Sequence, residues 1–443
     1  MLLFDNDVAY LPTLLCTFLL FFCGVQQHDD QVAAFLPSWR YQQRVHVALS
    51  VVVVDTSSSS NGNDDDDDVV GDDNRHLLEW QALEGGCQLL VTTVTPKAIV
   101  HFLGGAFVSP QPTVAYRYVL EQLAKKDYAI IATPFAVDFN YRKPAADIKD
   151  KFSKACRELE LAQDSENGND NDDRVRITNF SSLPQLAMGH SLGALMHVLL
   201  DCEYTKENGD DDDGTLSTTI SSTRGAALIS YNNKNVEGAI PGFKEVFVPA
   251  FSPLEPLTRD PKITDTLQRV QELRRTGFDT IRNIATMAPG VKPLVLKAID
   301  DAEAAAELVD QLPGVVASIA NGSTEFEPNP EEMRSLVVDK YTQASPLIVR
   351  FTNDPIDESD ILASILPKSL KIKQRDLPGT HLTPLAIDPN SDSTPLLPFP
   401  ETFTNSNGPF GDIRQDLLLT NADALVSILD DYFTESIQKV RDV

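Results

Sequence analysis

The segment Gly189-His190-Ser191-Leu192-Gly193 places a serine between two glycines, each two residues away from it. An apolar run precedes the segment and another follows it, so the pattern predicts a strand, a sharp turn at Ser191 and a helix. The neighbours two residues away must be small because such a turn strains the backbone of the serine. A hydroxyl held there, beside the amino end of a helix, is suited to attack a carbonyl carbon. A buried strand that turns into a buried helix without any chemistry is the alternative.

A histidine and an acid from elsewhere in the chain must activate this serine, because a free hydroxyl is a weak nucleophile. The acid is expected after the next-to-last strand of the sheet, and the histidine after the last. Of the seven histidines, only His381 lies beyond the last expected strand, in LPGTHLTPL. The segment VRFTNDPIDESD offers Asp354, which is favoured as the first acid after its strand, and Asp357 as the alternative. Asp360 is expected to lie in solvent, and His190 to point away from the serine.

The segment HFLGGAF (101–107) is the candidate for stabilising negative charge during acyl transfer. That reaction needs two backbone N–H groups aimed at the developing oxyanion. One is expected from Leu192, directly after the serine, and the other from the loop that follows a buried strand. The loop candidates are Leu103 and Ala106 as donors, with Gly104 and Gly105 allowing close approach of the backbone. No Gly-Lys-Ser/Thr follows, which argues against a phosphate-binding loop, and a plain structural turn is the remaining alternative.

A parallel sheet collects such distant segments at one edge, and the chain carries the alternating pattern of strands and helices from about residue 86. Short apolar runs predict strands, and segments with helical spacing lie between them. This alternation predicts an α/β fold with a mostly parallel central sheet and helices on both faces. The expected strands are 87–95, 97–104, 128–135, 183–190, 225–233, 345–354 and 369–379. The expected helices are 113–127, 145–163, 191–204, 358–369 and 422–443.

One long segment interrupts the alternation and predicts an insertion. Residues 244–340 carry helical patterns and little strand, so we expect a helical cap over the ends of the sheet, with mere elaboration as the alternative. The folded body is thereby divided into a first core part at 81–243, the cap, and a second core part at 341–443. The many Leu, Val and Ile residues of the cap indicate an apolar substrate, such as an acyl lipid.

The net charge of −28 comes largely from three acidic runs at 61–73, 164–173 and 208–214. Like charges repel one another and such runs cannot bury surface, so they indicate solvated loops. The sequence carries no basic patch, which argues against nucleic acid as a partner. Its five cysteines and seven histidines form no Cys-x-x-Cys motif or His/Cys cluster, so neither a metal nor an organic cofactor is expected. The wide spacing of the cysteines favours a reducing compartment.

The first 80 residues are expected to direct the protein to its compartment. Residues 1–34 contain an apolar run at 11–25, which is short for a transmembrane helix and typical of a signal peptide, although no basic residue precedes it. Residues 35–80 begin with basic and hydroxyl side chains, as in a transit peptide, and include the first acidic run. This order resembles the bipartite plastid leaders of diatoms and related algae, where cleavage precedes a phenylalanine, here Phe35. We therefore expect a plastid protein without a stable transmembrane anchor, with simple secretion as the alternative.

Four segments, in order along the chain, resemble the family called domain of unknown function 1350, which occurs in cyanobacteria and in plant and algal plastids. They are VHFLGGAFVSPQPTVAYRYVLEQLAKKDYAIIATPF, GHSLGALMH, FTNDPID and LPGTHLTPL, and the resemblance covers roughly residues 80 to 440. It implies an α/β-hydrolase fold, and it supports Ser191, Asp354 or Asp357, and His381 as site residues. The acidic inserts at 164–173 and 208–214 depart from the family.

Together these residues predict a serine hydrolase that cleaves an ester or thioester of a small-molecule or lipid acyl substrate. Ser191 would attack the carbonyl carbon, His381 would take its proton and pass it to the leaving group, and Asp354 would orient His381. Two alternatives use the same fold. One is a non-catalytic binding or scaffold protein, and the other is an acyltransferase that passes the acyl group to an acceptor other than water.

Overall fold

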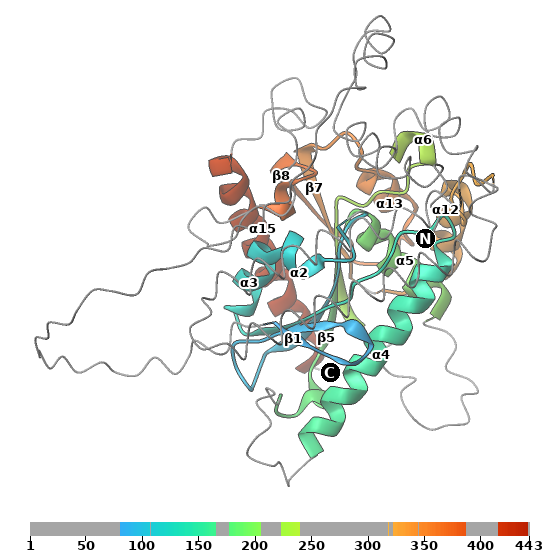
Figure 1. The fold of residues 1–443 in the computed structure, drawn as a ribbon. Helices are drawn as coiled ribbons and strands as arrows, with labels where there is room; N and C mark the ends of the chain where they lie inside the picture. Colours follow the sequence, from blue (N-terminus) through green and yellow to red (C-terminus); the bar gives the residue numbers. More distant parts are fainter. Residues whose placement is uncertain are drawn as a thin grey trace, which may run out of the picture.

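The computed structural model describes a central sheet and the helices around it (Figure 1). The described residues are 80–106, 108–164, 177–204, 223–239, 318, 322–343, 345–386 and 415–441. The expectations for the leader (1–34), for the transit segment (35–80, except Trp80) and for the acidic runs (except Asp164) fall outside these residues and stay predictions.

Eight strands form one sheet in the order β1-β2-β4-β3-β5-β6-β7-β8. β2 runs antiparallel to both of its neighbours, and the pairings β4-β3, β3-β5, β5-β6, β6-β7 and β7-β8 are parallel. The strands are β1 (Gln81–Ala82), β2 (Gln88–Leu90), β3 (Ala98–Leu103), β4 (Tyr128–Ala132), β5 (Gln185–His190), β6 (Thr223–Ile229), β7 (Leu347–Asn353) and β8 (Lys373–Thr380). This strand order, with helical connections, is that of the α/β-hydrolase fold, so the predicted fold class is confirmed.

Helices cover both faces of this sheet. They are α2 (Pro112–Ala115), α3 (Arg117–Ala124), α4 (Arg142–Asp164), α5 (Leu192–Tyr204), α6 (Val236–Ala239), α12 (Pro330–Lys340), α13 (Ser359–Ile365) and α15 (Gln415–Arg441). Figure 1 shows α3 and α15 on one side of the sheet, and α4, α5 and α12 on the other. Within the described ranges, no helix has both the length and the apolar composition that crossing a bilayer requires.

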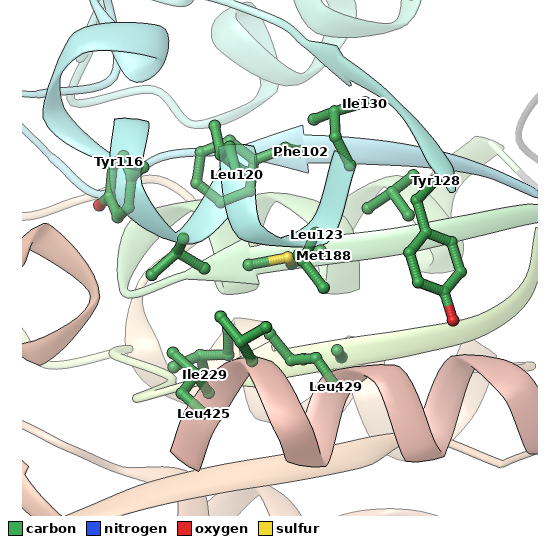
Figure 2. Packing of buried hydrophobic residues seen from close by; sticks show 14 of the residues in the cluster. Phe102, Tyr116, Leu120, Leu123, Tyr128, Ile130, Met188, Ile229, Leu425 and Leu429 are labelled. Carbon is green, nitrogen blue, oxygen red and sulfur yellow. The ribbon is translucent and has the colours of Figure 1, made fainter. Parts of the chain in front are cut away.

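Alternate residues of the central strands face the two helical layers, as the period of a strand demands. In β3, Val100 and Phe102 belong to the cluster that packs against α3 and α15, whereas Ile99 and Leu103 belong to the clusters on the side of α4 and α5. Figure 2 shows the first layer, where leucines of α3 and α15 meet side chains from one face of the strands. Burial on both faces explains why these strands appear in the sequence as continuous apolar runs rather than alternating ones.

The helix expected over 113–127 is divided at Tyr116. This residue has φ −109° and ψ 15°, outside the helical range, and it separates α2 from α3. The break places a buried tyrosine directly beside the loop after β3, where its hydroxyl finds partners. β1 was not expected, because two residues are too short to show a periodic pattern. The other expected strands and helices are present with shifted ends.

Most of the expected cap at 244–340 lies outside the described residues. The described part includes α12, whose amino end is capped by Asn329. The Asn329 side chain accepts from the Glu332 N–H, and the Glu332 carboxylate accepts from the Asn329 N–H. Met333 and Val337 of α12 are buried in the same cluster as the side chains of α5, so this helix packs onto the core of the fold.

Candidate active site

A strained serine stands at the turn from β5 to α5. Ser191 has a φ of +56°, in the left-handed region that side chains rarely adopt. A Cβ on Gly189 would lie 2.5 Å from the Gly193 carbonyl oxygen, and a Cβ on Gly193 would lie 2.6 Å from the Gly104 carbonyl oxygen. Both positions therefore require glycine. The Ser191 N–H donates to the Ile229 carbonyl of β6 (2.9 Å), which ties the turn to the neighbouring strand.

Three side chains from distant segments meet at this turn. Ser191 Oγ lies 3.0 Å from Nε2 of His381, and Nδ1 of His381 lies 2.7 Å from Oδ2 of Asp354. Asp354 follows β7 and His381 follows β8, so both side chains come from the carboxyl edge of the sheet, where β5 ends. The structure thus brings together the serine, the histidine and the favoured acid that the sequence singled out.

The surroundings of Asp354 and His381 determine where the protons lie. The Asp354 side chain is fully buried, and its other oxygen accepts from the Ile356 N–H (3.1 Å), which fixes the carboxylate. A carboxylate can only accept, so the proton of a neutral His381 lies on Nδ1 and points at Asp354. Nε2 then carries a lone pair that can accept from the Ser191 hydroxyl, as a general base must. The turn that carries His381 is held by Thr383, whose hydroxyl accepts from the Thr380 N–H (2.9 Å).

The alternative acid, Asp357, is occupied elsewhere. Its Oδ1 accepts from the N–H (3.1 Å) and the hydroxyl (2.5 Å) of Ser359, and its Oδ2 lies 3.5 Å from Nε of Arg350. Burial raises the pKa of Asp357, and the hydrogen bonds from Ser359 oppose that shift. Asp357 therefore fixes the loop between β7 and α13, and the structure does not bring it to His381. Asp360 is exposed and pairs with Arg350, in line with its expected place in solvent.

The loop after β3 lies directly beside Ser191. A Cβ on Gly105 would lie 3.2 Å from the Ser191 Cβ, so only glycine permits this approach without displacing a neighbour. The Gly105 N–H donates to the Tyr116 hydroxyl (2.7 Å) and is therefore not available as an oxyanion donor.

The three donor candidates named from the sequence are Leu192 and, from the loop, Leu103 and Ala106. Leu103 lies within β3, between two paired strands, so Ala106 is the better placed of the two loop donors. Leu192 is the first residue of α5, and the N–H groups of a first helical turn have no acceptor within the helix. The arrangement therefore favours Leu192 and Ala106 over Leu103.

A sequence profile places the chain in a family. The profile described as "Protein of unknown function (DUF1350)" matches residues 79–283 and 294–396, more than half of the chain. The chain belongs to this family. Among curated proteins, no sequence matches it significantly.

Solved structures similar to this DUF1350 protein include three from bacteria. A hydrolase from Pseudomonas aeruginosa PA01 is 12% identical, with 70% of this chain and 93% of that chain covered and a TM-score of 0.35. The 2-hydroxy-6-oxo-6-phenylhexa-2,4-dienoate hydrolase of Rhodococcus sp. strain RHA1 is 12% identical, with 69% and 93% covered and a TM-score of 0.37. The enol-lactonase of Burkholderia xenovorans LB400 is 12% identical, with 80% and 100% covered and a TM-score of 0.36. The fold assignment rests on the strand order given above.

Sequence reasoning missed two side chains of this site. Nδ1 of His190 lies 2.8 Å from the Tyr116 hydroxyl, and the rings of His190 and His381 lie 4.7 Å apart between centroids. His190 was expected only to point away from the serine, and the structure places its ring at the site, beside His381. The reason is that β5 lies next to β3 in the sheet, so the last side chain of β5 reaches the loop after β3. The position of His190 beside the serine was a usable signal, whereas no spacing indicated Tyr116.

The other described histidines of this DUF1350 protein lie in the core and not at the site. Nε2 of His101 lies 3.0 Å from the Thr133 hydroxyl, and its ring stacks on Phe152 at 3.7 Å. His197 in α5 places Nε2 3.1 Å from the Met188 carbonyl, to which it donates. In the part of the chain that the structure describes, no group of three His, Cys, Asp or Glu residues could hold a metal ion.

Stability is expected to fall on acidification through His197. Burial lowers the pKa of this histidine from 6.5 to about 4, so the folded chain keeps it neutral while the unfolded chain protonates it. Between those two values the unfolded state binds more protons, and the free energy of unfolding decreases as the pH falls. The stabilisation is fully present above pH 6.5 and is lost toward pH 4. By pH 5 the loss from this one group is about 2 kcal/mol.

The variant His197→Gln measures this contribution, because glutamine keeps a donor for the Met188 carbonyl and does not titrate. Urea unfolding at pH 8 gives the cost of the substitution itself, and unfolding at pH 5 gives the pH-dependent part. The variant is expected to lose less stability than the wild type between the two values. Equal losses in both proteins would contradict the role given to His197.

Proposed function

We propose that this DUF1350 protein is a serine hydrolase that cleaves a carboxylic ester or thioester. The observation that carries the proposal is the chain of contacts from Ser191 Oγ to His381 Nε2 (3.0 Å) and from His381 Nδ1 to Asp354 (2.7 Å). Supporting features are the strained backbone of Ser191 and the glycine loop that lies against it. A structural serine needs none of these, because a buried hydroxyl is satisfied by any single partner.

The reaction follows from the positions of these groups. The Ser191 oxygen attacks the carbonyl carbon while its proton moves to Nε2 of His381. The carbonyl oxygen becomes an oxyanion, held by the N–H groups of Leu192 and Ala106. The tetrahedral intermediate expels the alcohol or thiol, which takes the proton from His381 and leaves an acyl-serine. Water then attacks the acyl carbon, gives its proton to His381 and releases the acid, and the proton returns to Ser191.

Asp354 keeps its charge throughout this cycle. Its carboxylate holds the His381 ring in the required tautomer and stabilises the imidazolium that forms when the ring accepts a proton. An acyl lipid is a suitable substrate class, since the cap segment of the sequence is rich in Leu, Val and Ile.

A fluorophosphonate probe tests the proposal on the full-length protein. Such a probe phosphonylates only a serine that is activated by a base, so covalent labelling is expected in the wild type and is expected to be lost in Ser191→Ala. Intact-mass and peptide analysis locate the label. A folded wild-type protein that stays unlabelled would sink the hydrolase proposal and favour a binding or scaffold protein. Added alcohol acceptors report acyl transfer, because transfer yields a new ester where hydrolysis yields the free acid.

A further inference from the structure

The Tyr116 hydroxyl joins the loop after β3 to the end of β5. It accepts from the Gly105 N–H at 2.7 Å and lies 2.8 Å from Nδ1 of His190. Tyr116 is fully buried, and His190 is 2% exposed. A buried backbone N–H or hydroxyl that loses its partner destabilises the fold by about 1–3 kcal/mol. The two hydrogen bonds therefore hold the loop after β3, Tyr116 and the end of β5 in one arrangement.

The groups involved indicate the direction of each hydrogen bond. Gly105 N–H can only donate, so the Tyr116 oxygen accepts from it, and the one hydrogen of the hydroxyl is satisfied when it is donated to Nδ1 of His190, its other partner among the described contacts. The proton of a neutral His190 then lies on Nε2. Burial, and secondly the proximity of His381, lower the pKa of His190 well below its usual value. His190 therefore stays neutral beside His381, and it adds no positive charge that would oppose protonation of the base.

We propose that Tyr116 and His190 are positioning residues of this site, with the Tyr116 hydroxyl holding Gly105 N–H aside so that the next N–H, that of Ala106, faces the oxyanion. The inference rests on the proposed hydrolase function. His190 acts through Tyr116, because its Nδ1 fixes the direction of the hydroxyl. The aromatic ring of Tyr116 has a separate structural role: it packs against Phe102 with ring centroids 4.8 Å apart. Figure 2 shows the Tyr116 hydroxyl turned away from the buried side chains that surround Phe102.

The variant Tyr116→Phe separates the two roles, because it removes the hydroxyl and keeps the ring. We expect kcat and the rate of fluorophosphonate labelling to fall about tenfold, since removal of an oxyanion donor itself costs about 10²–10³ in kcat. KM is expected to change by less than about twofold, because the interaction is made mainly in the transition state. A residue with a merely structural role would lower stability without this split between kcat and KM.

Tyr432→Phe is the matched control. Tyr432 is also buried, and its hydroxyl donates to the Ser345 carbonyl at 2.7 Å. Ser345 precedes β7, so this bond lies at the amino edge of the sheet, away from Ser191. The control variant is expected to lose thermal stability comparable to that of Tyr116→Phe and to keep wild-type kcat and labelling rate.

Two variants of His190 test its positioning role separately from Tyr116→Phe, and a double variant then tests whether the two residues act together. Asparagine places its Oδ1 as many bonds from the backbone as Nδ1 of histidine, so His190→Asn can still accept from the Tyr116 hydroxyl. His190→Asn is expected to keep most of the turnover, and His190→Ala to lose about as much as Tyr116→Phe. The double variant Tyr116→Phe/His190→Ala is expected to be no worse than either single one, because residues that act in one network are not additive.

The outcomes distinguish this inference from the hydrolase proposal. If the wild type is labelled and Tyr116→Phe reacts at the same rate, the positioning role is overturned and the hydrolase proposal stands. Additive losses in the double variant, or equal losses in His190→Asn and His190→Ala, would likewise overturn the role of the Tyr116–His190 pair. A folded wild type that is not labelled at all would overturn both proposals.

Discussion

Replacement of Ser191 by alanine is expected to lower kcat for ester hydrolysis by about 10⁶-fold, and to leave a residual rate about 10³–10⁴ times that of the uncatalysed reaction, from the oxyanion donors and substrate binding alone. Alanine removes the hydroxyl that lies 3.0 Å from His381 Nε2 and leaves the glycines of the turn unchanged. The fold is expected to persist, because the strained φ of +56° is imposed by the turn and not by the hydroxyl. Hydrolysis of a p-nitrophenyl ester and the thermal midpoint, measured on the same preparation, check both parts.

Ser230→Ala is the matched control for this variant. Ser230 is also fully buried, has a φ of +47° and stands at the end of β6, and its N–H donates to the Val349 carbonyl at 2.8 Å. It shares the strain and the burial of Ser191 but does not contact His381 in any described hydrogen bond. The control is expected to hydrolyse the ester at the wild-type rate. Substantial turnover in Ser191→Ala would mean that the nucleophile lies elsewhere.

The parts of the site that the sequence predicted are those that depend on local pattern or on chain order. Gly189 and Gly193 indicate the turn because a Cβ at either position would collide with backbone. This requirement involves only the five residues from Gly189 to Gly193, so it can be recognised in the sequence. His381 follows from its place after the last strand, since a parallel sheet collects such residues at one edge. Asp354 was favoured over Asp357 by order alone, and the structure gives the physical reason, because Asp357 is held by Ser359.

Contacts that depend on side-chain direction could not be predicted. The bonds of the Tyr116 hydroxyl join residues 11 and 74 positions apart, and no periodic pattern records such a contact. Helical spacing over 113–127 also concealed the break at Tyr116, because the apolar period continues through it. The choice of Ala106 over Leu103 required knowledge of where β3 ends and of its pairing, because Leu103 lies within that strand, between two paired strands. Local sequence thus specifies the turn and the succession of strands along the chain, whereas the direction of each donor emerges only from packing.

Replacement of Asp354 by asparagine is expected to lower kcat by about 10⁴-fold while leaving KM nearly unchanged. The amide carries no charge, so it does not stabilise the imidazolium that forms when His381 takes the serine proton. Its NH₂ group can also donate to Nδ1, which would move the histidine proton to Nε2 and point it at Ser191. Because Asp354 is fully buried, water cannot take over either role.

Asp357→Asn makes this test specific, because it changes the same group three residues further along the chain. Asparagine keeps an oxygen for Ser359 and loses the charge opposite Arg350, so stability is expected to fall while kcat stays within about threefold of the wild type. Steady-state kinetics and thermal unfolding of both variants, side by side, measure the difference. If Asp357→Asn instead loses about 10⁴-fold and Asp354→Asn does not, the acid that orients His381 during turnover is Asp357, and the loop after β7 must rearrange before the reaction.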